Sequence, residues 1–310
     1  MGDVVRRGYL LATGMSSAAI SRAVDSGRLE RLARGAYAVP APPGHEEPPW
    51  ERYRTTVLAT APAFNAVVSH ESAAVLHGIP FLRPARSLVH FTVDRRHGGG
   101  VRRGAHIHPR PLGRHEIVLV DGARATSRVR TAIDVATTGD LERAVCAIDA
   151  VRLRRRYPSP DDPAPVTVAE LEECLSGLGR RRGVAVARRA IELSVDCSAS
   201  AGESWSRMQM LSAGIPLPRL QREHVLEGRQ YFADFDWGPL IGEFDGLDKY
   251  GTTSRAVTGA LAEEKAREET FAAAGIEVVR WGWRTLRAPG RLPLLLTTAL
   301  ARNGLIEVSR

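Results

Sequence analysis

The stretch "QYFADFDWGPLIGEFDG", residues 230–246, decides the fold of the C-terminal third of the chain. It holds two alternating runs around a Gly-Pro loop, and alternation with a period of two predicts β-strands. In that hairpin Trp237 pairs with Leu240, and Asp234 lies directly opposite Glu243. The pairing also sorts the other side chains. One face carries Ala233, Phe235, Trp237, Leu240 and Phe244, and the other carries Phe232, Asp234, Asp236, Glu243 and Asp245.

Four carboxylates on one face of a hairpin should repel one another, above all the opposed pair. A bound divalent cation removes that conflict, and hard oxygen ligands suit Mg²⁺ or Mn²⁺. We therefore predict a metal site made by Asp234, Glu243 and Asp245. The competing interpretation is an outer sheet face on which the acids are simply solvated.

The sequence on either side of the hairpin predicts helices and one more strand. Residues 202–218 form a helix with Glu203 in its first turn, and residues 263–286 give a helix followed by an apolar strand. Only two of the 43 basic residues are lysines, and both of them, Lys249 and Lys265, flank the acidic cluster. A lysine is a flexible point charge that approaches a single oxygen closely, which a planar guanidinium does not do.

Helix, strand meander, helix and strand is the core order of the PD-(D/E)xK nuclease fold. Residues 201–286 resemble the branch of that fold related to very-short-patch-repair endonucleases. The family's lysine stands two residues after its second acid, where this chain has Asp245. The resemblance implies metal-dependent hydrolysis of DNA phosphodiester bonds. The matching catalytic set is Asp234 as first acid, Glu243 as second acid, Glu203 on the first helix, Asp245, and Lys249 or Lys265 as the cation.

The N-terminal stretch "TGMSSAAISRAVDSGRLERLARGAYAVP", residues 13–40, predicts a winged helix-turn-helix. A serine cap precedes a short helix with one apolar face, and Gly27 ends that helix. The following residues alternate as a two-stranded wing that turns at Gly35. The alternative is a small helical module that packs only on other parts of the chain.

This layout resembles the N-terminal domain of the AbiEi family of antitoxins, in which G-x-L-x-x-L-x-x-G-x-Y follows a serine-rich helix. Here the pattern runs from Gly27 to Tyr37. In such a module the second helix enters the major groove and the wing follows the DNA backbone. The implied contacts are Ser16, Ser17, Ser21 and Arg22 to bases or phosphates, and Arg28, Arg31 and Arg34 to phosphates.

The middle of the chain alternates like strands at residues 88–95, 105–112 and 115–127, and it is strongly helical over 127–154. Residues 67–80 predict a strand end and then a helix. The order from SHxSAAxLHG to TSxxRTxxDxA extends the AbiEi resemblance across residues 67–136. We expect a scaffold that supports DNA binding or dimerisation. Structural roles are favoured over a metal site for its histidines, because no ligand spacing such as HExxH occurs: His70, His77, His90, His106, His108 and His115.

Proline-rich or polar joints divide the 310 residues into three expected domains: 1–50, 51–196 and 197–310. The joints are residues 38–52, residues 154–178 and residues 196–204. The second joint restarts as a helix near Val166, with Thr167 as its N-cap and Glu170 three residues later. The fold class expected is mixed α/β.

The chain has no apolar run of membrane-spanning length and no signal-peptide pattern at its start. Its three cysteines lack paired spacing, so we expect reduced thiols in a cytoplasmic protein. Residues 51–196 hold 23 bases and 16 acids and thereby supply +7 of the net charge of +8. An arginine-rich segment suits a phosphate partner. We expect DNA as the partner, with a homodimer as a candidate assembly.

Two functions remain open from the sequence. The first is a DNA-binding protein with a nuclease domain, and the second is a non-catalytic repressor of the antitoxin type whose nuclease-like domain only binds or dimerises. A kinase-like or nucleotidyltransferase role is disfavoured. The glycine-rich stretch at residues 97–104 neither follows a clear strand nor ends in the lysine and serine or threonine of a phosphate loop.

Overall fold

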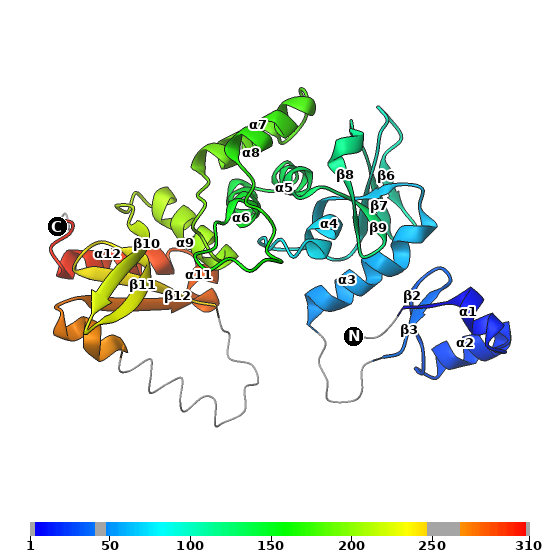
Figure 1. Cartoon of the computed structure of the whole chain (residues 1–310), viewed down its shortest axis with the longest axis horizontal. Helices are drawn as coiled ribbons and strands as arrows, with labels where there is room; N and C mark the ends of the chain where they lie inside the picture. The colour runs from blue at the N-terminus through cyan, green and yellow to red at the C-terminus, as the bar shows by residue number, and fades with distance from the viewer. Residues whose placement is uncertain (1–3, 41–47, 247–266, 308–310) are drawn as a thin grey trace. The chain divides into compact units, whose positions relative to one another are not determined.

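The computed structural model describes residues 4–40, 48–246 and 267–307 (Figure 1). The chain divides into two compact units. The first unit combines Met1–Val151 with Val166–Glu192, and the second combines Arg152–Pro165 with Leu193–Arg310. The mixed α/β class expected from the sequence is confirmed, because helices and several sheets share the chain. The three domain boundaries drawn from the sequence stay a prediction.

The N-terminal module holds two short helices and a three-stranded antiparallel sheet of order β1-β3-β2. Its elements are β1 (Val5–Arg6), α1 (Arg7–Ala12), α2 (Ser17–Asp25), β2 (Glu30–Ala33) and β3 (Ala36–Ala38). Leu10, Ile20, Ala23, Leu29 and Tyr37 form its core. The hairpin turns at Gly35, whose φ of 73° is a conformation that glycine adopts without steric cost. Strand β1 was not predicted, and it adds an edge to the wing.

Helix α3 (Pro49–Thr60) begins inside the segment that the sequence analysis assigned to a linker. Pro48 is the N-cap residue, and Pro49 is the first residue of the helix. A proline in the first turn is favourable because its missing N–H would have no helical partner there. The predicted linker over residues 38–52 is therefore wrong for residues 49–52. Arg6 ties this helix to the N-terminal module, since its guanidinium donates to the carbonyl oxygen of Ala59 at 2.7 Å.

A six-stranded sheet of order β6-β7-β5-β4-β9-β8 forms the centre of the first unit. The β5–β7 and β4–β9 pairs are parallel and the other pairs are antiparallel. All the strand segments predicted from alternation are present. The strands are β4 (Val67–Val68), β5 (Val89–Val93), β6 (Gly100–Arg102), β7 (Ala105–Pro109), β8 (Ile117–Val120) and β9 (Ala123–Thr126).

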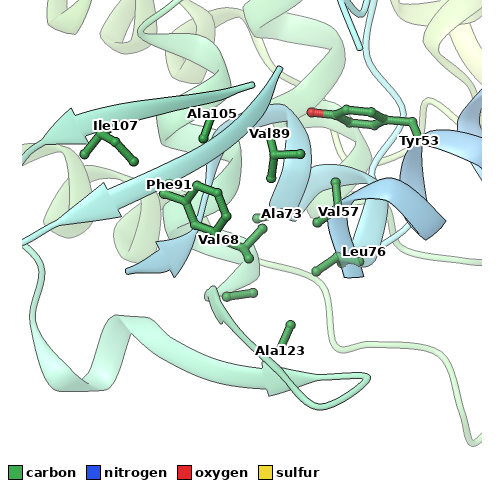
Figure 2. Close-up of a cluster of buried hydrophobic side chains, with 11 residues drawn as sticks. Tyr53, Val57, Val68, Ala73, Leu76, Val89, Phe91, Ala105, Ile107 and Ala123 are labelled. Atoms are coloured by element: carbon green, nitrogen blue, oxygen red, sulfur yellow. The ribbon is translucent and has the colours of Figure 1, made fainter. Parts of the chain in front are cut away.

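One face of this sheet packs on helices α3 and α4 (His70–Leu76) through a compact apolar cluster, which Figure 2 shows. Phe91 is fully buried there, and Ala105 and Ile107 lie beside it on the neighbouring strand. Tyr53 closes the cluster by sharing a 2.6 Å hydrogen bond with Ser72 and donating to the carbonyl oxygen of Leu88 at 2.7 Å.

Four further helices complete the first unit: α5 (Arg128–Ala136), α6 (Leu141–Arg152), α7 (Val168–Gly177) and α8 (Val184–Leu193). The predicted helix start at residue 167 is confirmed. The Thr167 hydroxyl accepts from the backbone N–H of Glu170, and the Glu170 carboxylate accepts from the backbone N–H of Thr167. This reciprocal capping satisfies two N–H groups that the helix itself cannot.

The second unit contains a four-stranded mixed sheet of order β10-β11-β12-β13, in which only β12 and β13 are parallel. The predicted hairpin register is confirmed by the Phe235–Gly242 and Asp236–Ile241 pairs. Residues 267–273 are helical. The named elements are α9 (Ala201–Ser212), β10 (Arg219–Leu226), β11 (Arg229–Asp236), β12 (Leu240–Asp245), β13 (Glu277–Gly282), α11 (Trp283–Arg287) and α12 (Arg291–Arg302).

Each face of this sheet makes buried apolar contacts. Phe235, Leu240 and Trp281 join the core formed with α12, whereas Ile241 packs on Phe271 from the helical residues 267–273. The face that carries the acids is therefore covered in part by an apolar contact. This excludes the interpretation of that face as a fully solvated surface.

Candidate functional site

The N-terminal module presents its polar side chains on the surface away from its core. Ile20 and Ala23 anchor one face of α2 inside the module, which fixes the opposite face outward. The Ser16 hydroxyl caps α2 by accepting from the N–H of Ala19 at 3.1 Å, and Arg7 donates to the Ser17 hydroxyl at 2.8 Å. All seven side chains predicted to contact DNA are exposed: Ser16, Ser17, Ser21, Arg22, Arg28, Arg31 and Arg34.

The three arginines predicted to contact phosphate follow the hairpin. Arg28 lies just after α2, Arg31 lies on β2, and Arg34 lies in the turn before Gly35. Arg28 donates to the nearby Ser26 hydroxyl at 3.2 Å. Three cations spaced along one hairpin give a basic edge that suits the regularly spaced charges of a nucleic-acid backbone.

In the second unit, Gln221 bridges two of the predicted acids. Its side-chain amide donates to Asp234 Oδ1 at 2.9 Å and to Glu203 Oε2 at 3.2 Å. Gln221 has a φ of 50°, a conformation that costs free energy for a side-chain-bearing residue and occurs often at functional sites. The second Asp234 oxygen accepts from the N–H of Phe244 at 2.9 Å.

Glu203 and Asp234 line a small cavity of about 10 Å³, room for roughly one water molecule. Burial, and after it the nearby charge of Asp234, raise the pKa of Glu203 to about 7, against hydrogen bonds that lower it. Burial also raises the pKa of Asp234. The pair is therefore able to hold a proton near neutral pH, as a general acid or base must.

Glu243 is neutralised by two arginines in the described structure. Arg267 pairs with one of its carboxylate oxygens, and Arg280 Nε lies 3.2 Å from the other. Arg280 reaches it because the parallel register of β12 and β13 places these two residues side by side. Burial raises the pKa of Glu243 while the two guanidinium groups lower it.

The two remaining acids of the hairpin differ in their surroundings. Asp236 is buried and turns to His224 at 2.5 Å and Arg222 at 3.3 Å, both on β10. Asp245 is exposed at the end of β12. Lys249 and Lys265 lie outside the described residues.

The predicted Mg²⁺ site can be tested against the carboxylate oxygens of Asp234 and Glu243. Both Asp234 oxygens accept from protein donors, and both Glu243 oxygens are ion-paired with arginines. The acids do not form a group of three potential ligands within 4.8 Å in the described part of the chain. The arrangement as it stands does not fit Mg²⁺, which needs free oxygen ligands at short distance.

The two motifs of the middle segment build a buried polar network. Ser127 caps α5, and Arg130 pairs with Asp134 at 3.1 Å and with Glu116 at 2.8 Å. Ser72 accepts from the N–H of His90 at 2.8 Å. These contacts give the motif residues a structural role, because buried charges are tolerated only when paired.

Three of the histidines expected to be structural converge on the six-stranded sheet. His90 on β5 is the register partner of His106 on β7, and His108 follows two residues later on the same face. Within residues 4–40, 48–246 and 267–307, these three histidines form the one group of three or more potential metal ligands whose ligand atoms lie within 4.8 Å of one another. The sequence signal is an H-x-H pair on a strand, which becomes informative only when His90 is known to lie on the adjacent strand.

None of the described helices has the length and apolar character needed to cross a membrane. Two uncharacterized proteins of Mycobacterium tuberculosis, MT2308 and Rv2248, are 28% identical to the chain over 188 residues, 59% of this chain. The match covers 64% of the length of these curated relatives. The crystal structure of the RV2827C protein from Mycobacterium tuberculosis aligns over 70% of this chain and 78% of its own, with 20% identity and a TM-score of 0.39.

A family model gives the most specific match. It covers residues 2–40, the stretch that carries the short helices, the Gly35 turn and the exposed arginines. The family is described as the transcriptional regulator, AbiEi antitoxin. The N-terminal module of this chain therefore matches the AbiEi antitoxin family of transcriptional regulators.

Proposed function

We propose that the protein is a DNA-binding transcriptional regulator that contacts duplex DNA through its N-terminal module. The observation that carries the proposal is the coincidence of the AbiEi match at residues 2–40 with seven exposed hydroxyl and guanidinium side chains. Transcriptional regulators of the AbiEi type bind DNA. The apolar core under α2 supports the proposal, because it holds the outward face of the helix rigidly.

In this proposal α2 enters the major groove and the β2–β3 hairpin follows the backbone. Ser17, Ser21 and Arg22 lie on the exposed side of α2 and would meet base edges or phosphates. Arg28, Arg31 and Arg34 would contact phosphates, which position the protein without reading sequence. The hydroxyl of Ser16 is already used as the helix cap, so its part in DNA binding is indirect.

The experiment is a titration of duplex binding against salt concentration for the full chain. Replacing Arg28, Arg31 and Arg34 together by Ala should weaken binding and reduce the slope of log affinity against log salt by about one unit per lost phosphate contact. A matched control replaces Arg219, Arg229 and Arg291, which are exposed in the second unit, by Ala. Equal slopes for the two variants would contradict the proposal.

We extend the proposal to a homodimer, because helix-turn-helix regulators usually read two half-sites one helical turn apart. Light scattering of the free protein and of its complex with DNA measures the number of chains. A single chain in both states would contradict the dimer and leave the DNA-binding proposal in place.

The second candidate is a metal-dependent DNA endonuclease with Asp234, Glu243 and Asp245 at Mg²⁺ or Mn²⁺. It is favoured by the element order of residues 201–282, a helix, a strand meander, helical residues 267–273 and a parallel last strand. The bridged pair of Glu203 and Asp234 also favours it. The ion pairs that Arg267 and Arg280 make with the Glu243 carboxylate argue against it.

Cleavage assays with Mg²⁺ or Mn²⁺ on single- and double-stranded DNA test this candidate. Cleavage by the full chain that is lost in Asp234→Asn would support it. No cleavage under any of these conditions, with duplex binding retained, would leave the regulator as the sole function proposed. If the full chain cleaves DNA, replacing Lys249 and Lys265 by Met, one at a time, would assign the lysine of the expected catalytic set.

A further inference from the structure

The histidine cluster of the first unit lies on the sheet face opposite the apolar core. Val89, Phe91, Ala105 and Ile107 turn into that core, as Figure 2 shows, so the residues between them must turn the other way. Two neighbouring strands thereby place His90, His106 and His108 together. No loop is needed to hold them, and sites built on strands are held more precisely than sites on loops.

The spacing of the three imidazoles suits one metal ion. One ring nitrogen from each histidine can be chosen so that all three lie within 4.8 Å of one another. His90 Nδ1 and His108 Nε2 are 3.0 Å apart. Two nitrogens on a tetrahedral Zn²⁺, each about 2.0–2.1 Å from the ion, are roughly 3.3 Å apart. The His90–His108 pair is therefore already close to the separation that a tetrahedral ion requires.

Coordination needs a lone pair on one nitrogen of each ring, which a neutral imidazole offers. His90 Nδ1 and His108 Nε2 share a hydrogen bond, so one of these two nitrogens carries the proton between them. An ion bound there replaces that hydrogen bond, and the proton moves to the other nitrogen of its own ring, so that both rings stay neutral.

A fourth histidine, His70, packs against the cluster. The ring of His70 stacks on His108 with the centroids 3.8 Å apart. His70 is 1% exposed, and its Nδ1 shares a 2.9 Å hydrogen bond with Ser69. Among the described residues, its Nε2 has no hydrogen-bond partner. This packing fixes the plane of His108. His90 and His106 are only half-buried, so an ion can enter from their side.

We propose that His90, His106 and His108 bind one divalent transition-metal ion, through one imidazole nitrogen each. Imidazole ligands suit ions such as Zn²⁺ and Co²⁺ rather than Mg²⁺, which prefers oxygen. Three protein ligands leave the fourth tetrahedral position to water or to a further ligand, the pattern of an open zinc site. The site shares no residue with the acidic cluster of the second unit or with the N-terminal module.

The test uses the full chain after treatment with a chelator, with Co²⁺ alone as the first probe. The expected result is one equivalent of Co²⁺ bound with the intense visible absorption of a tetrahedral ion. The spectrum should lack the thiolate charge-transfer band that Cys146, Cys174 or Cys197 would produce. Weak octahedral absorption, or a thiolate band, would overturn the proposal without any variant.

Variants then assign the ligands by calorimetric titration with Zn²⁺. His106→Gln and His90→Gln should each lower the affinity for Zn²⁺ at least about 100-fold, the upper end of losses seen when only an outer partner is removed. His97→Gln is the matched control, because His97 is an exposed histidine of the same unit. Circular dichroism of the metal-free variants confirms folding. Unchanged affinity in the first two variants, or an equal loss in the control, would overturn the proposal.

Discussion

Arg280 Nε lies 3.2 Å from Glu243 Oε2, and the two residues are register partners on the parallel strands β12 and β13. Arg267 holds the other oxygen of the same carboxylate. The repulsion expected among the acids of the hairpin is thus relieved at Glu243 by arginines. A metal at this carboxylate would have to displace at least one of them.

Replacing Glu243 by Gln should destabilise the second unit by about 1–3 kcal/mol, because two partly buried guanidinium groups lose a charged partner. The measurement is urea unfolding followed by tryptophan fluorescence. Glu223→Gln removes the same charge on β10, where the side chain is exposed. That control should change the free energy of unfolding by less than about 0.5 kcal/mol. Equal losses in both variants would mean that the arginine pairs contribute little.

The hairpin register was predictable from the sequence, whereas the partners of the acids were not. Alternation and the Gly-Pro loop define the pairing of β11 with β12, and those signals are local. Arg280 reaches Glu243 only through a parallel pairing of strands about 30 residues apart, which alternation does not specify. Gln221 lies on β10, whose sequence "RLQREHVL" lacks a regular alternation. The hydrogen bonds of Gln221 to Glu203 and Asp234 could therefore not be predicted from the sequence around it.

The first unit shows the same limit. Thr167 and Glu170 form the predicted cap because that motif is complete within four residues. The convergence of His90 with His106 depends on β5 and β7 being neighbours with β6 on the outside. Strand order is a property of the whole sheet, and the spacing of histidines along the chain does not contain it.

Ser16→Ala should destabilise the N-terminal module by about 1 kcal/mol, because the N–H of Ala19 loses its cap. Ser16→Asp should keep that stability, since Asp is an equally good cap, and should weaken duplex binding by placing a negative charge near phosphates. Hydrogen exchange of the α2 amides measures the first effect, and a binding titration measures the second. Fast exchange in Ser16→Asp would show that the cap is not what stabilises α2.

Gly202→Ala should destabilise the second unit, although Ala is normally favoured over Gly within a helix by about 1 kcal/mol. A Cβ at residue 202 would lie 2.0 Å from Cε1 of Phe244, whose ring packs edge-on against Trp283. Overpacking of this kind costs about 1–3 kcal/mol. Urea unfolding followed by tryptophan fluorescence measures the change.

The control for this prediction is Gly177→Ala in α7, where an added Cβ meets no atom within 4 Å. That variant should be neutral or slightly stabilising. Adding Phe244→Leu to Gly202→Ala should recover part of the lost stability, because the smaller side chain makes room for the methyl group. Additive losses in the double variant would show that the clash with Phe244 is not the cause.

Glu203 should make the stability of the second unit depend on pH. Its folded pKa is raised to about 7 from the usual 4.5, chiefly because the carboxyl is buried. Between these two values the folded state holds a proton that the unfolded state has lost. The stabilisation from this group is therefore complete below about pH 4.5 and is lost as the pH rises through about 7.

The comparison between the wild-type chain and Glu203→Gln isolates that effect. At about 1.4 kcal/mol per pKa unit, the free energy of unfolding of the wild type should fall relative to the variant by about 2–3 kcal/mol from pH 5 to pH 8. Tryptophan fluorescence reports this transition, since Trp205, Trp237, Trp281 and Trp283 all lie in the second unit. Glu223→Gln is the same change at an exposed position on β10. Its free energy of unfolding should depend on pH in the same way as that of the wild type. If Glu203→Gln also runs parallel to the wild type, the carboxyl of Glu203 ionises normally in the folded chain, and the Glu203–Asp234 pair holds no proton near neutral pH.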